Sequence, residues 1–130
     1  WKQQLKYIGY GGLGKQVRDI VHVDDVVALI DYQIHNLSKF EGKLFNAGGG
    51  LQNSASLREM TALCEKITGN KIRIESETET RPADLRIYIT DNQKIMEETG
   101  WKPARNLENI FGDIFNWIHH NHEQLKHVLK

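Results

Sequence analysis

The pattern that decides how this chain folds is the run Gln16-Val17-Arg18-Asp19-Ile20-Val21-His22-Val23-Asp24-Asp25. Its β-branched residues from 17 to 23 favour a short extended segment. Apolar side chains then recur three and four residues apart, at Val23, Val26, Val27, Ile30, Ile34 and Leu37. This spacing predicts an amphipathic helix that begins on the acidic pair Asp24-Asp25 as its cap and ends near Asn36.

Before this run lies a glycine-rich segment, residues 9–15, which is predicted to be a flexible loop. Its glycines and Lys15 match the spacing of the phosphate-binding pattern G-x-x-x-x-G-K-[ST]. However, position 16 is Gln instead of the hydroxyl residue that holds magnesium, and an extended segment follows instead of a helix. The segment is therefore interpreted as a connecting loop and not as a P-loop.

After this run, two further segments are expected to be strands. Residues 43–47 are short and apolar and stop at Gly48-Gly49-Gly50, and residues 71–78 alternate apolar and polar side chains. Arg81-Pro82-Ala83-Asp84 is expected to be a turn, because its proline keeps Arg81 extended.

Three more helices are predicted. The capping box Ser56-Leu57-Arg58-Glu59 begins a helix that Gly69 ends. A short helix is expected between Asp91 and Gly100, and a longer one has a broad apolar face from Leu107 to Ile118. Alternating strands and helices indicate an α/β fold, although three short strands would make a thin sheet.

The composition is that of a globular protein, with 39% hydrophobic and 26% charged residues among 130. Seventeen basic residues balance seventeen acidic ones, which gives no electrostatic support for nucleic acid or an anionic membrane as a partner. No apolar run approaches the ~18 residues of a membrane span. A single cysteine, Cys64, fits a reducing cytoplasm. Because the chain opens on Trp1, it is expected to be a fragment of a longer protein.

Two arginines beside glycine-rich segments, Arg18 and Arg81, are candidates for chemistry. The guanidinium fork matches phosphate oxygens in pairs, so both could converge on a pyrophosphate. Asp84, in the same turn as Arg81, could accept hydrogen bonds from ribose hydroxyls. From the residues alone, the alternative in which these loop side chains are solvated or form weak surface pairs is favoured.

Aromatic and imidazole side chains near the C-terminus are given structural interpretations. Trp101 and Trp117 are expected to pack in the core instead of stacking on a ligand. A solvated helix end is preferred to a metal site for the histidines, since no acid or cysteine stands at ligand spacing. These histidines are His119, His120, His122 and His127.

Four motifs follow one another through nearly the whole chain. They are Arg18-Asp19-x-x-His22-Val23-x-Asp25, Asn46-Ala47-Gly48-Gly49-Gly50, Arg81-Pro82-Ala83-Asp84 and Gly100-Trp101-Lys102-Pro103. In this order and spacing they resemble the C-terminal part of the extended short-chain dehydrogenases/reductases that modify nucleotide sugars. The triple glycine and the residues after it, 52–57, are most similar to the CDP-paratose (CDP-tyvelose) 2-epimerases.

The resemblance implies a fold and a site. Residues 1–130 would be the C-terminal fragment of a Rossmann-type α/β enzyme, comprising the substrate-binding domain with the last strand and helix elements of the Rossmann half. Arg18 and Arg81 would bind the diphosphate of a nucleotide-diphosphate sugar, and Asp84 would hold the ribose. Gln16 and Val17 would lie beside the base and pyrophosphate.

Further roles follow from the same resemblance. The loop 10–14 would fold over the nucleotide, and Asp25 would be structural, at the start of the helix behind Arg18. The turn of this family is usually Arg-Pro-Gly-Asp, whereas this chain has Ala83. Because alanine tolerates a positive φ poorly, either this residue is not left-handed or the turn is altered.

The cofactor that the resemblance implies is NAD, bound by an N-terminal part outside this chain. Residues 1–130 contain neither a G-x-x-G-x-x-G fingerprint nor a Tyr-x-x-x-Lys pair, so catalytic residues are expected upstream and this fragment alone is expected to be inactive. The implied reaction is transient oxidation and re-reduction of the sugar in a dimeric parent enzyme, as in a 2-epimerase. A nucleotide-sugar 4-epimerase, a 4,6-dehydratase, a non-catalytic nucleotide-binding module and a structural domain with solvated arginines stay open as alternatives.

Overall fold

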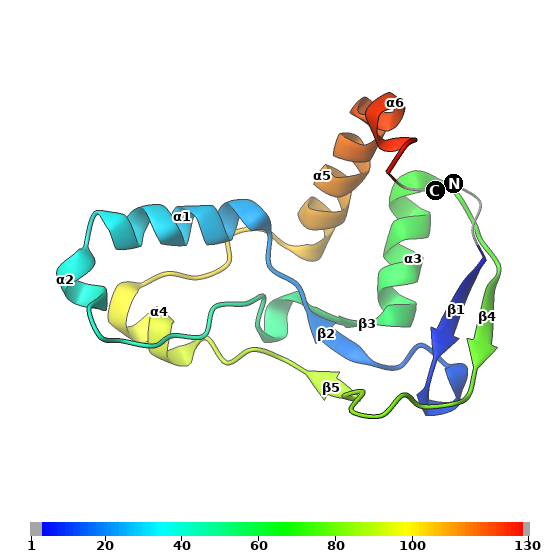
Figure 1. Cartoon of the computed structure of the whole chain (residues 1–130), viewed down its shortest axis with the longest axis horizontal. Helices are drawn as coiled ribbons and strands as arrows, with labels where there is room; N and C mark the ends of the chain where they lie inside the picture. The colour runs from blue at the N-terminus through cyan, green and yellow to red at the C-terminus, as the bar shows by residue number, and fades with distance from the viewer. Residues whose placement is uncertain (1–3, 129–130) are drawn as a thin grey trace.

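Residues 4–128, which the computed structural model describes, form two small β-sheets flanked by helices (Figure 1). The strands are β1 (Leu5–Ile8), β2 (Val17–Asp19), β3 (Ser54–Ser56), β4 (Ile74–Glu77) and β5 (Ile87–Tyr88). One sheet pairs β1 with β4 in parallel. The other has the order β3-β2-β5, with β2 antiparallel to β3 and parallel to β5. The central strand β2 therefore carries the first residues of the motif that decides the fold.

Helices surround these sheets unevenly. They are α1 (Val23–Ile34), α2 (Leu37–Phe40), α3 (Leu57–Thr68), α4 (Gln93–Thr99), α5 (Leu107–His120) and α6 (His122–Leu125). Figure 1 shows the β1–β4 sheet at one end of the molecule and α1, α2 and α4 at the other, with β2 between them. Helices α3 and α5 pack against each other. No helix among the described residues is long and apolar enough to cross a membrane.

The predicted helices are confirmed, including the signals that begin and end them. Ser56 Oγ accepts from the Glu59 amide at 3.2 Å, and the Ser56 amide donates to Glu59 Oε2 at 2.7 Å, so the capping box is complete. Gly69 and Gly100 end α3 and α4 in the left-handed region, with φ of 71° and 73°. Their positive φ explains why glycine stands at both positions.

Two terminal details of the helices differ from the prediction. The cap of α1 is His22, whose Nδ1 accepts from the Asp24 amide at 3.0 Å, so the acidic pair lies inside the first turn and is not the cap. The solvated helix end expected for the histidines is not one continuous helix, because α5 ends at His120 and residues 122–125 form the separate short helix α6.

The expected strand at residues 43–47 does not form, because no other strand lies beside it within residues 4–128. An extended segment becomes a strand only when its backbone pairs with a neighbour. Here the Leu44 carbonyl accepts from Lys94 Nζ at 2.9 Å, and Leu44 is 84% exposed. The later strand, expected at 71–78, is confirmed in its central part as β4.

The glycine-rich segment before β2 is packed instead of flexible. A short 3-10 turn, Tyr10–Gly12, interrupts it, and Ser76 Oγ in β4 donates to the Gly12 carbonyl at 2.8 Å. A Cβ on Gly12 would lie 2.6 Å from Ser76 Cβ, and one on Gly14 would lie 2.9 Å from the Tyr7 ring. Glycine is thus required by close packing as much as by turn geometry.

Apart from glycines, burial within residues 4–128 is shared equally between apolar and polar residues. The buried apolar residues are Leu29, Ala55, Ile95 and Ile110, and the buried polar ones are Gln16, Asp25, Asn53 and Asn92. Trp101 is half-buried and donates from Nε1 to the Asp25 carbonyl at 3.1 Å. The expectation for Trp117 is wrong, since this side chain is 57% exposed on α5.

Asp25 ties the start of α1 to the segment before α5. It is 3% exposed, and its Oδ1 accepts from Arg105 Nη1 at 2.8 Å. Its Oδ2 accepts from the amides of Ala104 and Arg105, both at 3.2 Å. Each oxygen of this buried carboxylate therefore has a partner, as a buried charge requires, which agrees with a structural role.

The triple-glycine segment passes against the end of β2 at very short range. Gly50 donates from its amide to Asp19 Oδ2 at 2.9 Å. Partial burial acts to raise the pKa of Asp19, but hydrogen bonds from Gly50 and from the hydroxyl and amide of Thr90 outweigh it and hold that pKa below its usual value. A Cβ on Gly49 would lie only 2.2 Å from the Ile20 carbonyl oxygen.

Replacing Gly49 by alanine is therefore expected to destabilise the fold severely, because the clash is with rigid backbone. We expect a loss of about 3 kcal/mol or more in the free energy of unfolding, measured by urea denaturation. The matched control is Gly112→Ala in the middle of α5, where a Cβ meets nothing within 4 Å. That change should stabilise the helix by about 0.5–1 kcal/mol. Equal effects of the two substitutions would contradict the close approach.

Candidate functional site

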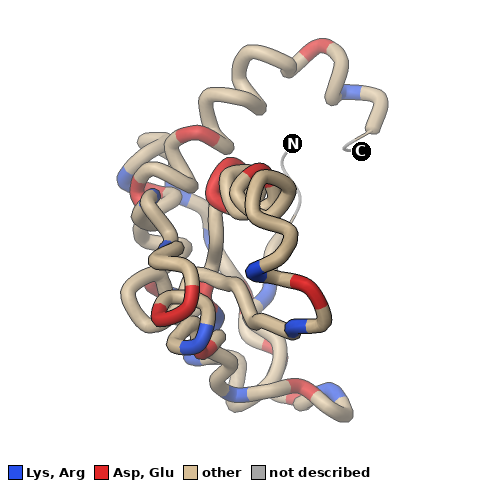
Figure 2. Tube along the Cα trace, turned by 90° about the vertical axis from the view of Figure 1, so that its left-hand side faces the viewer, with Lys and Arg blue, Asp and Glu red and all other residues tan. Residues whose placement is uncertain are grey.

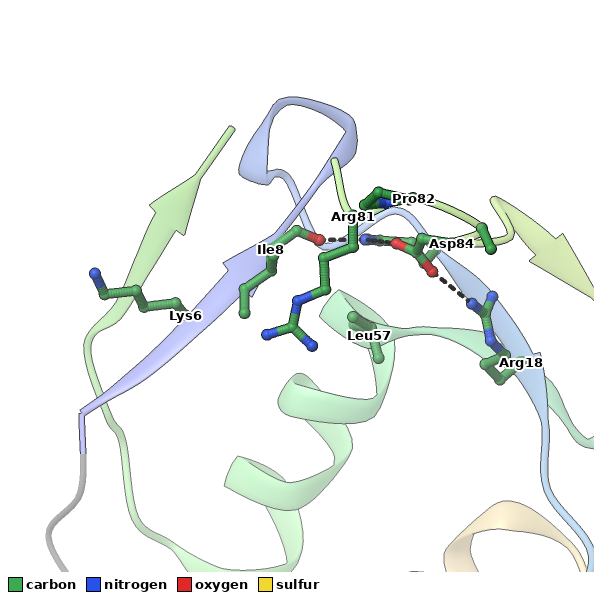
Figure 3. A pocket seen from close by; sticks show the side chains of 9 residues that line it. Lys6, Ile8, Arg18, Leu57, Arg81, Pro82 and Asp84 are labelled. Carbon is green, nitrogen blue, oxygen red and sulfur yellow. Dashed lines mark hydrogen bonds and ion pairs between the residues drawn. The ribbon is translucent and has the colours of Figure 1, made fainter. Parts of the chain in front are cut away.

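An open pocket of about 400 Å³ lies between β1, β2, the start of α3 and the turn at residues 81–84 (Figure 3). It is lined by Lys6, Ile8, Gln16, Arg18, Leu57, Arg81, Pro82, Ala83 and Asp84. Four of the five site residues expected from the sequence therefore meet in one pocket, although Gln16 and Asp84 are 68 positions apart. Val17 is the exception.

Strand geometry explains which residues of the motif reach this pocket. Successive side chains of an extended segment point to opposite sides. Gln16 and Arg18 line the pocket, whereas Val17 and Asp19 alternate with them. Asp19 instead bonds to the triple-glycine segment on the other side of β2.

Arg18 is held in place by two acceptors. Its Nη2 lies 3.1 Å from Asp84 Oδ1, and its Nη1 donates to the Val17 carbonyl at 2.8 Å. The side chains of Arg18 and Asp84 remain 34% and 24% exposed, so the pair still faces solvent. Asp84 is therefore, in this structure, the counter-ion of Arg18.

Arg81 has a different environment. Its guanidinium makes no hydrogen bond or ion pair with any residue in the part of the chain that the structure describes. Figure 3 shows this side chain reaching past Ile8 toward Leu57, with Arg18 on the other side of Asp84. Lys6 adds a third cation to the pocket wall, and its Nζ lies 3.7 Å from Glu75 Oε2. The lining thus contains three cations and a single carboxylate.

The turn that carries Arg81 and Asp84 keeps its left-handed residue. The Asp84 amide donates to the Arg81 carbonyl at 3.2 Å, and Ala83 has a φ of 63°. Of the two alternatives stated for Ala83, the structure therefore shows a left-handed alanine in an otherwise closed turn. An L-residue with a side chain pays about 1 kcal/mol for this conformation.

A second strained residue fastens this turn to the glycine-rich loop. Tyr10 has a φ of 47°, and its hydroxyl donates to the Asp84 carbonyl. Its amide donates to Thr80 Oγ1 at 3.0 Å, and the Arg86 guanidinium lies 5.0 Å from the centre of its ring. Backbone strain of this kind persists only where surrounding contacts enforce it.

The N-terminus of α3 lies at the pocket, but its amides are already used. Leu57 and Arg58 donate to the carbonyls of Gln16 and Gly14, at 3.0 and 2.9 Å, and Glu59 donates to Ser56 Oγ. A helix N-terminus binds anions through free amides. Positive charge for an anion must therefore come from the guanidinium and ammonium groups here.

A larger pocket of about 1140 Å³ lies beside the triple-glycine segment and α4, but its chemistry is less informative. Its charged lining residues are Asp91, Glu97 and Lys102, so acidic groups outnumber basic ones. The rest of its lining is mostly apolar and amide side chains and glycine. This balance does not suit a phosphate ligand, so the smaller pocket is the candidate site.

The histidines expected at a solvated helix end do lie there, exposed on and around α6. Within residues 4–128, no three His, Cys, Asp or Glu side chains come together in a group that could hold a metal ion. Cys64 is half-buried in α3, and desolvation raises the pKa of its thiol.

Sequence reasoning missed three lining residues, Lys6, Ile8 and Leu57. Lys6 and Ile8 share one face of β1, a strand that the sequence did not predict. Four residues offer too short a window for periodicity to be read. The sequence indicates Leu57 only as part of a capping box, and its place in the pocket lining follows from the packing of the start of α3 beside β2.

Fold and site together define an α/β chain whose pocket is lined by two arginines and a lysine. The family model of GDP-mannose 4,6 dehydratase matches residues 2–114. CDP-paratose 2-epimerase of Salmonella typhi is 33% identical over 106 residues, which is 82% of this chain and 31% of the relative. The resemblance stated from the motifs is thereby confirmed.

Two solved structures show how the fold compares. dTDP-glucose 4,6-dehydratase of Bacillus anthracis, a complex with NAD, has a TM-score of 0.69 at 26% identity, covering 89% of this chain and 35% of that one. UDP-glucose 4-epimerase of Thermotoga maritima, with UDP-glucose, has a TM-score of 0.60 at 32% identity, covering 81% and 32%. The chain thus spans about a third of the length of the proteins it matches.

The chain belongs to the GDP-mannose 4,6-dehydratase family, among the nucleotide-sugar epimerases and dehydratases of the extended short-chain dehydrogenase/reductase type.

Replacing Ala83 by glycine is expected to stabilise the protein by about 0.5–1 kcal/mol, because glycine adopts the left-handed conformation without strain. The measurement is the free energy of unfolding in urea. As a control, Ala62→Gly on the exposed side of α3 should destabilise by about 1 kcal/mol. If both substitutions destabilised equally, the strain at Ala83 would have no energetic consequence.

Proposed function

We propose that the pocket between β1, β2 and the turn at 81–84 binds the diphosphate of a nucleotide-diphosphate sugar. Arg18 and Arg81 would bind phosphate oxygens, and Asp84 would lie beside the ribose. Gln16 belongs to the same proposed site, Val17 contributes to it through the backbone carbonyl that accepts from Arg18 Nη1, and the loop 10–14 would lie over the nucleotide.

One observation carries this proposal: Arg81 extends into the pocket with no partner among the described residues. An arginine without a carboxylate or carbonyl partner, beside two other cations, leaves a positive surplus that a diphosphate neutralises. Guanidinium–phosphate contacts are bidentate and charge-assisted, which makes them among the stronger hydrogen bonds in proteins.

The charge distribution outside the pocket supports a local rather than a general anion site. Figure 2 shows acidic and basic positions interspersed along the trace, without a long stretch of one sign. The whole sequence is electrically neutral. Attraction for a phosphate ligand therefore depends on the few cations at the pocket.

At the level of the reaction, we assign this chain to an NAD-dependent nucleotide-sugar epimerase that resembles the CDP-paratose/tyvelose 2-epimerases. The 33% identity to the Salmonella typhi enzyme supports this type, although a UDP-glucose 4-epimerase of Arabidopsis thaliana is also 33% identical. The 4-epimerase and 4,6-dehydratase alternatives are supported by the two structural relatives. The activity belongs to the complete protein, and this chain would contribute positioning of the substrate, which by itself accelerates reactions strongly.

The residues present in this chain do not fit a dinucleotide site. The glycine-rich loop leads into β2 instead of a helix N-terminus, and the triple glycine leads into a single 3-10 turn, Leu51–Asn53. We therefore assign NAD to a preceding part of the protein and derive no catalytic step from residues 1–130.

Removing the Arg81 guanidinium tests the phosphate site. Arg81→Ala is expected to weaken nucleoside diphosphate binding by about 1.5–3 kcal/mol, the range for hydrogen bonds to charged groups. This loss of binding free energy is measured by calorimetric titration of the complete protein with CDP, UDP and dTDP. If CDP binds most tightly, the result would favour the enzymes of the family that act on cytidine-diphosphate sugars. Arg73→Ala, at an exposed residue outside the pocket, is the control of equal charge and should leave affinity unchanged.

Either of two outcomes would contradict the proposal. Absence of binding by the wild-type protein for all three nucleotides would remove the site altogether. Equal affinity of wild type, Arg81→Ala and Arg73→Ala would show that the nucleotide binds elsewhere.

A further inference from the structure

Gln16 joins three segments at the floor of the pocket. It is 4% exposed, and its Nε2 donates to the Ile8 carbonyl in β1 and, at 3.4 Å, to Asp84 Oδ2. The backbone carbonyl of Gln16 accepts from the Leu57 amide at 3.0 Å. The residue therefore connects β1, the turn at 81–84 and the start of α3.

The orientation of the Gln16 side-chain amide is determined by the hydrogen bonds that its Nε2 donates. Its Oε1 is buried and has no hydrogen-bond partner. An unsatisfied buried acceptor is costly, so the stabilising part of this side chain is Nε2, which faces two acceptors. If the amide were turned over, Oε1 would face the Ile8 carbonyl and the Asp84 carboxylate, and both contacts would become repulsive.

Asp84 lies between Gln16 and Arg18 and uses a different oxygen for each. Oδ2 receives Gln16 Nε2, and Oδ1 receives Arg18 Nη2 at 3.1 Å. A carboxylate held at both oxygens cannot rotate freely, so its plane fixes the guanidinium paired with it. Figure 3 shows this sequence of contacts running from Ile8 to Arg18 along the pocket wall.

We infer that Gln16 is a positioning residue for phosphate binding: its Nε2 fixes the Asp84 carboxylate, and Asp84 fixes the Arg18 guanidinium in the pocket. This inference rests on the proposed function and assigns a residue through which that site is pre-organised. Its role is exerted on Arg18 and requires no contact between Gln16 and the nucleotide.

Gln16→Glu tests the donor directly, because it keeps the size of the side chain and replaces the NH₂ by oxygen. At pH 8, two carboxylates would face each other where Nε2 and Oδ2 are now 3.4 Å apart. At pH 5, the pair can share a proton, since adjacent carboxylates ionise with difficulty together. A protonated Glu at position 16 then donates to Asp84 as the amide does.

The charged and titratable groups around this pair come from four segments. They are Lys6 from β1, Tyr10 from the glycine-rich loop, Arg18 from β2 and Arg81 from the turn. The cations are common to wild type and variant, and the phosphate of the nucleotide titrates equally for both. The quantity to compare is therefore the ratio of variant to wild-type dissociation constant at each pH.

We expect Gln16→Glu to bind CDP, or whichever of CDP, UDP and dTDP binds wild type most tightly, about tenfold or more weakly at pH 8 and nearly as wild type at pH 5. Gln16→Met, which removes the donor without adding charge, should weaken binding equally at both values. Gln52→Glu, an exposed residue of the other pocket, gives the same charge change and should keep a ratio of one.

A double variant separates positioning from general damage to the fold. In Gln16→Glu with Asp84→Asn, the amide and carboxylate exchange places, so a donor and an acceptor face each other again. We expect this variant to bind more tightly at pH 8 than Gln16→Glu alone, with thermal unfolding confirming that each protein is folded. If Gln16→Glu is unfolded at pH 8, Gln16→Met and the double variant carry the comparison.

The outcomes distinguish this inference from the function on which it rests. Failure of wild type to bind any of the three nucleotides would overturn the proposed function. Binding by wild type, with a Gln16→Glu ratio that does not change between pH 8 and pH 5 or with undiminished binding by Gln16→Met, would overturn the positioning role alone.

Discussion

The hydrogen bond from the Gly50 amide to the Asp19 carboxylate ties the end of β2 to the triple-glycine segment, and the pocket depends on that strand. Because side chains of a strand alternate, Asp19 anchors one side of β2 while Gln16 and Arg18 serve the other. The favourable hydrogen bonds outweigh partial burial and hold the pKa of Asp19 below its usual value, so the anchor is an anion at neutral pH. Gly49 allows the triple-glycine segment to approach the end of β2 closely, since any Cβ at this position would overlap the Ile20 carbonyl.

Polar contacts between segments that are distant in the sequence provide much of the stabilisation that a large apolar core provides in other proteins. Asp25 reaches Arg105, Asn53 donates to the Arg105 carbonyl at 2.7 Å, and Asn92 exchanges two hydrogen bonds with Gly48 at 2.9 and 3.0 Å. Buried polar groups must find partners, so each of these contacts is specific to one arrangement of the chain. By contrast, the apolar face of α1 is largely exposed, with Val23, Val27 and Ile34 each more than half accessible.

The helices could be predicted because their signals are local, as the capping box at Ser56 and the left-handed glycines show. Strands depend on partners that a short sequence window does not reveal, which is why β1 was missed and residues 43–47 were assigned to a strand that does not form. The exposure of Trp117 could not be predicted for a similar reason. Apolar periodicity identifies the apolar face of a helix, but it does not show which segment, if any, packs against that face. In the site, the motifs identified Arg18, Arg81 and Asp84, yet the pairing of Asp84 with Arg18 and the bond from Tyr10 to the turn required the structure.

The two arginines of the pocket would lose different amounts of side-chain freedom on binding a phosphate. Arg18 already has its guanidinium placed by Asp84 and by the Val17 carbonyl, so little side-chain freedom remains to be lost. Arg81 makes no hydrogen bond or ion pair with any described residue, and ordering a long side chain costs up to about 2 kcal/mol. The paired guanidinium of Arg18 determines where a phosphate can bind, whereas the unpaired guanidinium of Arg81 can adjust to the position of the ligand. The left-handed alanine between Arg81 and Asp84 links these two arginines, because a single tight turn carries both the unpaired guanidinium and the carboxylate that pairs with Arg18.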